Sequence, residues 1–147
     1  MNKCSIIICQ WLGLAVGTSI YLFARPKECL VLSLLDFLGL GKEISLIRAT
    51  TIPISKSIPN WLRFSLPDGL WVLSYTCLIC YIWDFNLNRR NIFWFALLPI
   101  LAVGSEIMQS FRIISGTFDY FDIVAYIVGF LVPFIIFNIN FKISNEK

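Results

Sequence analysis

Five polar side chains near the C-terminal end of the chain interrupt a strongly apolar sequence at spacings that would let them act together. They are Glu106, Gln109, Arg112, Asp119 and Asp122. Carboxylates, an amide and a guanidinium can neutralise one another, bind a polar or basic group, or transfer a proton. A charged group near the centre of a bilayer costs about 2.5–3.5 kcal/mol on insertion scales, so Glu106 needs a counter-charge, a hydrogen-bond donor or a proton.

Three of these residues share one face of a predicted helix over residues 92–111. Glu106, Gln109 and Arg112 follow one another at intervals of three residues, which places them on successive turns of the same face. Because a helix rises about 1.5 Å per residue, Glu106 lies roughly 7 to 8 Å inside the end of this helix. We expect Gln109 to donate a hydrogen bond to Glu106.

The helix that follows begins with two further acids. Asp119 and Asp122 lie one turn apart at its start, and Tyr126 follows on the same side. A short connection makes two consecutive helices antiparallel neighbours, so their polar faces can meet. We therefore expect Arg112 to pair with one of the two aspartates. Tyr126 is expected to donate a hydrogen bond to Glu106.

An earlier stretch, SLPDGLW, is typical of a helix start and supplies another acid. Ser65 is in place to cap the helix, Pro67 suits its first turn, and Asp68 lies where the helix dipole favours negative charge. If the helices alternate in direction, Asp68 and Trp71 join the other polar residues at one end. A purely structural interpretation stays open, because Asp68 and Asp119 could simply cap helices, at about 0.5–2 kcal/mol each.

Four apolar segments must position these side chains. They cover residues 4–24, 66–83, 92–111 and 121–141. A helix of about 20 apolar residues crosses a bilayer and satisfies its own backbone hydrogen bonds there. The first segment also resembles a signal peptide, but its apolar run is longer than the usual core of roughly 7 to 15 residues, so we expect a retained helix. The sequence predicts an all-α polytopic membrane protein, a four-helix transmembrane bundle forming a single domain over residues 1–147.

The long connection over residues 25–65 is predicted to form an interfacial amphipathic segment. Residues 29–40 are too short to cross a bilayer, and Ser33 and Asp36 give them a narrow polar seam. We expect a short helix here that lies in the membrane interface and stops near Gly39. The stretch TTIPISKSIPNWLRF contains two prolines and is expected to be extended.

The composition excludes several classes of function. Hydrophobic residues make up 58% of the 147-residue chain and charged residues only 14%, against about 25% in soluble domains. The basic residues are scattered, so nucleic acid is not an expected partner. The chain has no histidine, and Cys77 and Cys80 lie within an apolar run as ordinary small buried residues. We therefore expect no metal site and no cofactor.

The basic residues also predict an orientation in the cell membrane. The short loop over residues 84–91 carries Arg89 and Arg90, and four alternating helices place Lys3 and Lys147 on the same side. The positive-inside rule then makes this side, with both termini, cytoplasmic. The opposite side holds more basic residues, but they are spread over a long segment.

Taken together, the polar motifs resemble those of VanZ-like membrane proteins. The pattern ExxQ at Glu106, then DxxD from Asp119 to Asp122, then Gly129, is similar to the C-terminal half of that family. Tyr126 stands where the family often has asparagine, so the chain looks closer to an uncharacterised branch with DxxxYxxG in its last helix. The resemblance implies a small four-helix membrane protein. It implies no particular chemistry, and the teicoplanin resistance associated with the namesake does not carry over to this chain.

Four functional hypotheses follow. The first is a non-enzymatic envelope protein whose outer acidic pocket, with residues 29–64 as a lid, binds a membrane lipid headgroup, a lipid-linked molecule or a segment of another membrane protein. The second is a membrane-embedded acid/base enzyme acting on a lipid-linked substrate. The third is a proton-coupled carrier that titrates Glu106 and forms a homo-oligomer through the GxxxG of Gly13 and Gly17. The fourth is a subunit of a larger complex. We favour the first, because the sequence lacks histidine and an evident activated nucleophile.

Overall fold

The computed structural model describes residues 3–25, 30–137 and 140–141, which are mostly helical and include two short strands. The helices are α1 (Lys3–Ala24), α2 (Leu30–Phe37), α3 (Gly41–Ser55), α4 (Asn60–Ile82), α5 (Ile92–Ser110) and α6 (Tyr120–Ile136). Strands β1 (Asn86–Leu87) and β2 (Asn140–Phe141) pair in parallel. The prediction of a helical chain is confirmed.

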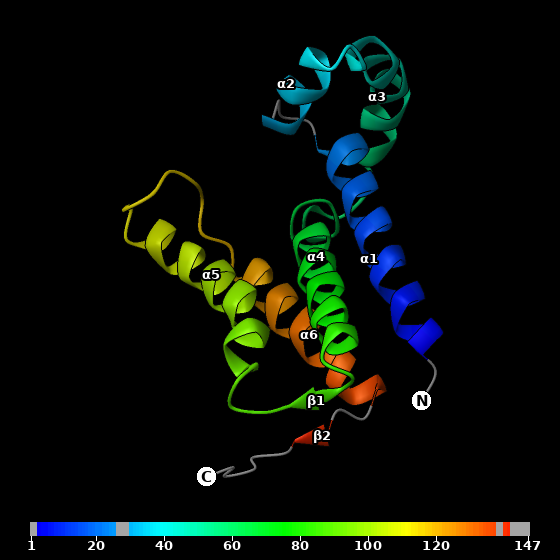
Figure 1. Cartoon of the computed structure of the whole chain (residues 1–147). Helices are drawn as coiled ribbons and strands as arrows, with labels where there is room; N and C mark the ends of the chain where they lie inside the picture. The colour runs from blue at the N-terminus through cyan, green and yellow to red at the C-terminus, as the bar shows by residue number, and fades with distance from the viewer. Residues whose placement is uncertain (1–2, 26–29, 138–139, 142–147) are drawn as a thin grey trace.

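The four long helices run in alternating directions (Figure 1). The start of α1 and the two strands lie together at one end, which we call the strand end. The end of α1, the start of α4, the end of α5 and the start of α6 lie at the other, which we call the open end. Helices α2 and α3 sit beyond the open end of α1.

Three helices are long and apolar enough to cross a membrane, namely α1, α4 and α5. Three of the four predicted segments therefore form helices with the length and composition of a membrane span. Helix α6 is apolar but has only 17 residues and ends at Ile136, well before residue 141. Pro133 lies in its last turn and cannot donate a backbone hydrogen bond, which favours an early helix end.

Helix α1 packs closely on α4 through small residues. A Cβ atom added at Gly17 would lie 3.1 Å from the carbonyl oxygen of Pro67, and one at Gly13 would lie 3.2 Å from that of Leu70. The GxxxG pair thus brings two helices of one chain together, as small residues do in membrane helix pairs. Its use in a homo-oligomer stays untested.

Helix α4 packs even more closely on α6 across its opposite side. A Cβ atom at Gly129 would lie 2.2 Å from the carbonyl oxygen of Gly69, and one at Gly69 would lie 2.8 Å from that of Ala125. Contacts this close require glycine, since real Cβ atoms essentially never approach within 3.0 Å. Helix α4 is therefore the central element, held between α1 and α6.

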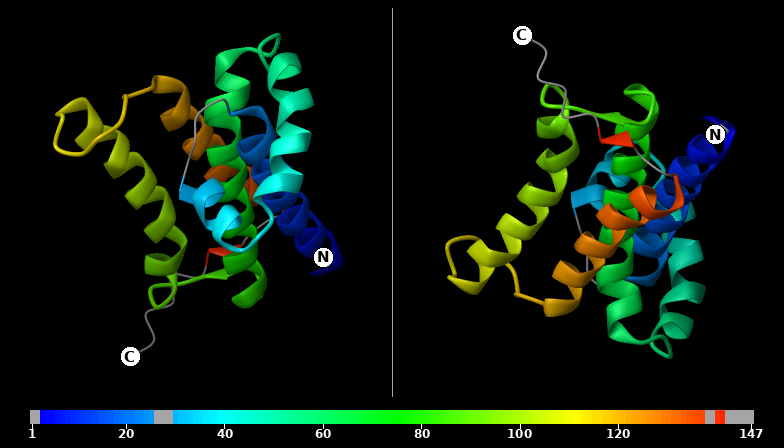
Figure 2. Two further views of the ribbon diagram at one scale, coloured as in Figure 1. Left: turned by 90° about the horizontal axis from the view of Figure 1, so that it is seen from above. Right: turned by 90° about the horizontal axis from the view of Figure 1, so that it is seen from below.

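Helix α5 leans away from the other three toward the open end (Figures 1 and 2). Only 11% of the residues in an apolar 18-residue stretch of α5 are buried inside the protein, against 50% in the corresponding stretch of α4. The main apolar core instead lies largely toward the strand end and consists of Ile6, Cys77, Ile79, Cys80, Phe85, Leu87, Phe95 and Phe137. Close packing at one end and divergence at the other leave room between the helices at the open end. As predicted, Cys77 and Cys80 are fully buried.

The connection between the first two spans is more helical than the sequence predicts. Helix α2 and its end before Gly39, which has a left-handed φ of +81°, match the prediction of a short helix. The expectation of an extended stretch over residues 50–64 is wrong for residues 50–55 and 60–64, because α4 begins at Asn60 and α3 continues to Ser55 with Pro53 in its last turn. Proline is tolerated there because few hydrogen bonds of the helix remain to be broken.

Helix α3 is tied to the C-terminal end of α1 by side chains from one face. The last carbonyl groups of a helix lack partners within it. Thr51 Oγ1 donates to the carbonyl of Phe23 at 2.8 Å, and Ser55 Oγ donates to that of Ala24 at 3.0 Å. Arg48 donates to two more carbonyls of the same turn, those of Leu22 and Arg25. These hydrogen bonds hold α3 against the C-terminal end of α1.

Helix α4 begins earlier than the sequence predicts. It starts at Asn60, directly after Pro59, so Ser65 lies inside the helix and is buried. The interpretation of Ser65 as a cap is wrong, and Asp68 lies in the third turn, where the dipole of the helix start no longer acts. Pro59 is the proline that directly precedes the helix, whereas Pro67 lies within it.

Candidate functional site

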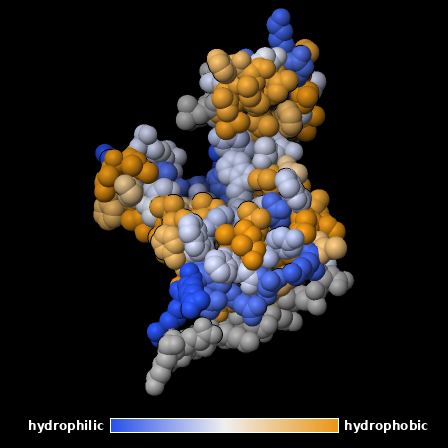
Figure 3. All heavy atoms as spheres, viewed as in Figure 1, coloured by the Kyte–Doolittle hydropathy of each residue, from blue (hydrophilic) through white to orange (hydrophobic). Residues whose placement is uncertain are grey.

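A pocket of about 550 Å³ lies between the four long helices at the open end. Its lining consists of Tyr21, Arg25, Phe64, Asp68, Ser105, Glu106, Gln109, Thr117, Asp119, Asp122 and Tyr126. Figure 3 shows this face of the molecule hollowed between the end of α5 and the α2–α3 segment. The divergence of α5 from α4 thus opens a space at the place where the polar residues of several helices converge. Six of the eight predicted site residues line it.

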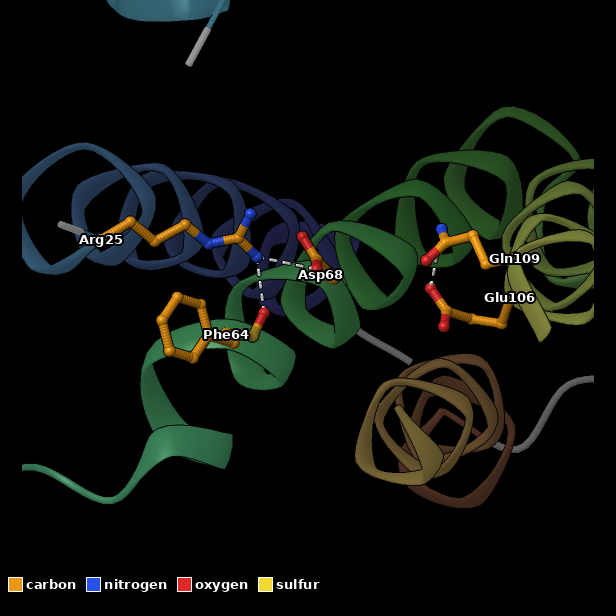
Figure 4. A network of polar contacts seen from close by, with 5 residues as sticks. All are labelled: Arg25, Phe64, Asp68, Glu106 and Gln109. Atoms are coloured by element: carbon orange, nitrogen blue, oxygen red, sulfur yellow. Dashed lines mark hydrogen bonds and ion pairs between the residues drawn. The ribbon is translucent and has the colours of Figure 1, made fainter. Parts of the chain in front are cut away.

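One wall of the pocket is built from α1 and α4 around an ion pair. Arg25 Nη2 lies 2.9 Å from Asp68 Oδ2 and donates to the carbonyl of Phe64 at 2.6 Å (Figure 4). The guanidinium carbon also lies 4.4 Å from the centre of the Tyr21 ring, within range of a cation–π contact. Arg25 therefore supplies the counter-charge of Asp68.

The facing wall comes from α5 and the start of α6. Glu106 is only 3% exposed. Its Oε2 accepts a hydrogen bond from the backbone N–H of Asp119 at 3.2 Å, and its Oε1 accepts one from Gln109 Nε2 at 3.5 Å. The predicted Gln109 contact is confirmed, although at this length it is weak. Figure 4 shows both side chains extending from α5 toward the part of α4 that carries Asp68.

The two aspartates at the start of α6 have different roles. Asp119 Oδ1 accepts a hydrogen bond from the backbone N–H of Phe121 at 2.9 Å, which makes it the N-cap of α6. The structural interpretation of Asp119 as a cap is therefore confirmed. Asp122 lies in the first turn, and its Oδ1 is buried without a hydrogen-bond partner among the described residues. Asp122 is thus an acceptor in the pocket wall whose hydrogen bonding is incomplete.

Two predicted site residues lie outside the pocket lining. Arg112 follows the end of α5 in a left-handed conformation with φ of 57° and is exposed, so it does not continue the face of Glu106. No ion pair joins it to Asp119 or Asp122 within residues 30–137, and the predicted pairing is wrong. Trp71 Nε1 donates to Thr18 Oγ1 at 3.3 Å and packs α4 on α1 behind the pocket.

Tyr126 takes the predicted position but not the predicted contact. It lines the pocket and is buried. Within the described part of the chain, its hydroxyl makes no hydrogen bond to Glu106. Instead, the backbone of Asp119 satisfies Glu106. Tyr126 therefore contributes an aromatic wall next to the carboxylates.

Sequence reasoning missed Arg25, whose role depends on a contact across 43 residues. A signal was present, because Arg25 follows the first apolar segment directly, and two antiparallel helices place this end beside the start of the helix that carries Asp68. Four carboxylates and one guanidinium line the pocket, so its lining is predominantly acidic. Among the described residues, no group of three or more metal-ligating side chains is arranged to hold an ion.

Comparison of the chain with protein-family models, curated proteins and solved structures gave no match. The resemblance to VanZ-like proteins therefore stays a prediction that depends on short motifs. The fold and pocket define a helical protein with three apolar helices of membrane-spanning length and a polar pocket at one end of them.

Proposed function

We propose that this chain is a multi-pass protein of the cell envelope whose pocket binds a polar headgroup, a lipid-linked molecule or a partner segment without transforming it. In this proposal α6 crosses the membrane together with α1, α4 and α5, in a four-helix bundle of the VanZ-like kind. Its 17 residues span about 26 Å at 1.5 Å each, close to the hydrocarbon thickness of a bilayer. The termini are cytoplasmic, and the pocket faces the outer leaflet.

One observation carries the proposal, namely that carboxylates from three helices and the end of α1 meet in an open pocket of about 550 Å³. This volume lies in the usual range of ligand sites, roughly 300–1,000 Å³. Intramembrane ionisable groups are costly and are a reason to expect a functional site. Asp68 has a protein partner in Arg25, whereas the nearby Asp122 leaves an acceptor atom unfilled.

Binding is favoured over catalysis by the chemistry of the lining. Ser105 Oγ donates to the carbonyl of Ala102 within its own helix and not to a carboxylate of the lining, which would have to accept its proton as general base. The serine of the lining is therefore not arranged as an activated nucleophile.

Mass spectrometry of molecules that co-purify with the protein tests the proposal. We expect the wild-type protein to retain a lipid or lipid-linked molecule, and Glu106→Gln and Asp122→Asn to lose most of it at equal amounts of folded protein. Asp84→Asn is the matched control, because Asp84 lies in the turn after α4 at the strand end, far from the pocket lining, and forms an ion pair with Lys3. Identical retained molecules in all four proteins would exclude a binding role for the pocket.

A further inference from the structure

Two polar atoms of the pocket lining are buried without a hydrogen-bond partner among the described residues, and their chemistry is complementary. One is Oδ1 of Asp122, an acceptor, and the other is Nε of Arg25, a donor. Both residues line the same pocket from different helix ends. Buried polar atoms are nearly always paired, so an unpaired atom in a native structure calls for a missing partner. A ligand that offers both a donor and an acceptor would fit this pocket.

The charge of the lining defines the donor. Arg25 neutralises Asp68, and Asp119 caps its own helix. Glu106 and Asp122 then remain as carboxylates without a basic side chain, because Arg112 lies outside the lining. A cationic donor is the group that such a pair attracts most strongly. The unfilled position on Asp122 is a hydrogen-bond acceptor, so the cation must also be a hydrogen-bond donor, as an ammonium with N–H groups is.

The unpartnered Nε atom of Arg25 defines the acceptor that the ligand must offer. The Nη2 atom of Arg25 already serves Asp68 and the carbonyl of Phe64, whereas the buried Nε–H of the same guanidinium has no partner among the described residues. A phosphate oxygen is a strong acceptor for such a donor. The overall excess of carboxylates disfavours a ligand that carries only negative charge.

We infer that the pocket holds the zwitterionic headgroup of an aminophospholipid, with its primary ammonium at Asp122, attracted also by the negative charge of Glu106, and its phosphate toward Arg25. This inference rests on the proposed binding function and names the ligand class. A lipid is favoured over a soluble molecule because the pocket lies at the end of apolar helices. Exposed apolar side chains of α5, including Ile100, Leu101 and Ile107, lead away from it and can contact acyl chains.

Native mass spectrometry of the purified full chain in detergent, with added lipids of identical acyl chains, tests the inference. Phosphatidylethanolamine offers a primary ammonium and a phosphate, phosphatidylcholine lacks the N–H donors, and phosphatidylglycerol lacks the cation. We expect phosphatidylethanolamine to bind about tenfold or more tightly than the other two, as the loss of one charge-assisted hydrogen bond predicts. The preference should disappear in Asp122→Asn and persist in Asp122→Glu and in the control Asp84→Asn.

A second variant keeps the inference testable if Asp122→Asn fails to fold. Thr117 lines the pocket from the exposed turn between α5 and α6, so Thr117→Trp narrows the pocket without removing a buried contact. It should also weaken phosphatidylethanolamine binding about tenfold or more, while a tryptophan at the exposed Thr50 of α3 should leave binding unchanged.

The outcomes separate the inference from the proposed function. Equal binding of the three lipids, or a preference for phosphatidylglycerol, overturns the zwitterion but leaves a binding pocket if Glu106→Gln weakens the interaction. Lipid binding that none of the pocket variants changes overturns both. If free phosphoethanolamine competes at the same concentrations as the lipid, the headgroup chemistry is supported, but the natural ligand is a soluble molecule and not a lipid.

Discussion

Replacing Gly129 by alanine should weaken the contact between α4 and α6 more than replacing Gly69 does. The new Cβ atom would lie 2.2 Å from the carbonyl oxygen of Gly69. To reach even the 3.0 Å limit of real contacts, the two helices must separate by about 0.8 Å. The obstacle is backbone, which cannot rotate away as the end of a flexible side chain could.

The expected cost follows from this displacement. Inserting a methyl group into a well-packed contact typically costs about 1–3 kcal/mol. The upper part of this range applies here, because a whole helix must move and the contacts along α4 and α6 are loosened together. Alanine also has a higher helix propensity than glycine by about 0.8–1.0 kcal/mol in water, which offsets part of the cost. We expect a net loss of about 2 kcal/mol in the free energy of unfolding.

Gly104→Ala provides the matched control for this measurement. Gly104 lies within α5, and a Cβ atom added there meets nothing within 4 Å. The two variants therefore change propensity equally and differ only in the steric contact. Unfolding by sodium dodecyl sulfate in mixed micelles, followed by circular dichroism, should show Gly129→Ala less stable and Gly104→Ala equal to or above wild type. Equal stability of the two variants would refute the close contact between α4 and α6.

Three further predictions concern the open end. Arg25→Gln and Asp68→Asn should each lower the free energy of unfolding by about 2 kcal/mol, between the values for exposed and buried pairs, because these side chains keep 21% and 18% exposure. Thr51→Val should cost about 0.5–1.5 kcal/mol in the same assay, since its hydroxyl satisfies the carbonyl of Phe23 at the end of α1. A cysteine at Thr117 should react in whole cells with a membrane-impermeant maleimide, because the proposal places the turn between α5 and α6 outside the cell.

Each of these predictions has a distinct contrary result. If the variant with both Arg25→Gln and Asp68→Asn loses as much stability as the two single variants together, the pair does not interact. Thr50→Val is the control for Thr51, because the Thr50 hydroxyl bonds only within its own helix, and equal losses would contradict the cap on α1. If a cysteine at Asn88 were labelled and one at Thr117 were not, the proposed orientation would be wrong. Asn88 directly follows β1 at the strand end.

Local sequence patterns were sufficient for the features that depend on neighbouring residues. The apolar runs predicted helices, because a chain without water must satisfy its backbone internally. Gly39 marked the end of α2, and the interval of three residues placed Gln109 beside Glu106. The same reasoning identified Asp119 as a possible helix cap. Each of these contacts joins residues within one or two turns of each other.

The same local reasoning failed where two signals competed. Ser65 and Pro67 resemble a helix start, but Pro59 comes earlier and the helix continues through both. Arg112 would continue the polar face of α5 only if the helix continued as well, and a left-handed turn ends it first. A helical face extrapolated past the end of its helix no longer predicts where a side chain lies.

By itself, the sequence determined that the chain forms apolar helices and that acids lie near the ends of three of them. Only the tertiary structure decided that Arg25 neutralises Asp68 and that α5 diverges to open a pocket. The physical reason is that these features depend on how closely helices approach, which glycines such as Gly69 and Gly129 set through contacts between segments far apart in the chain.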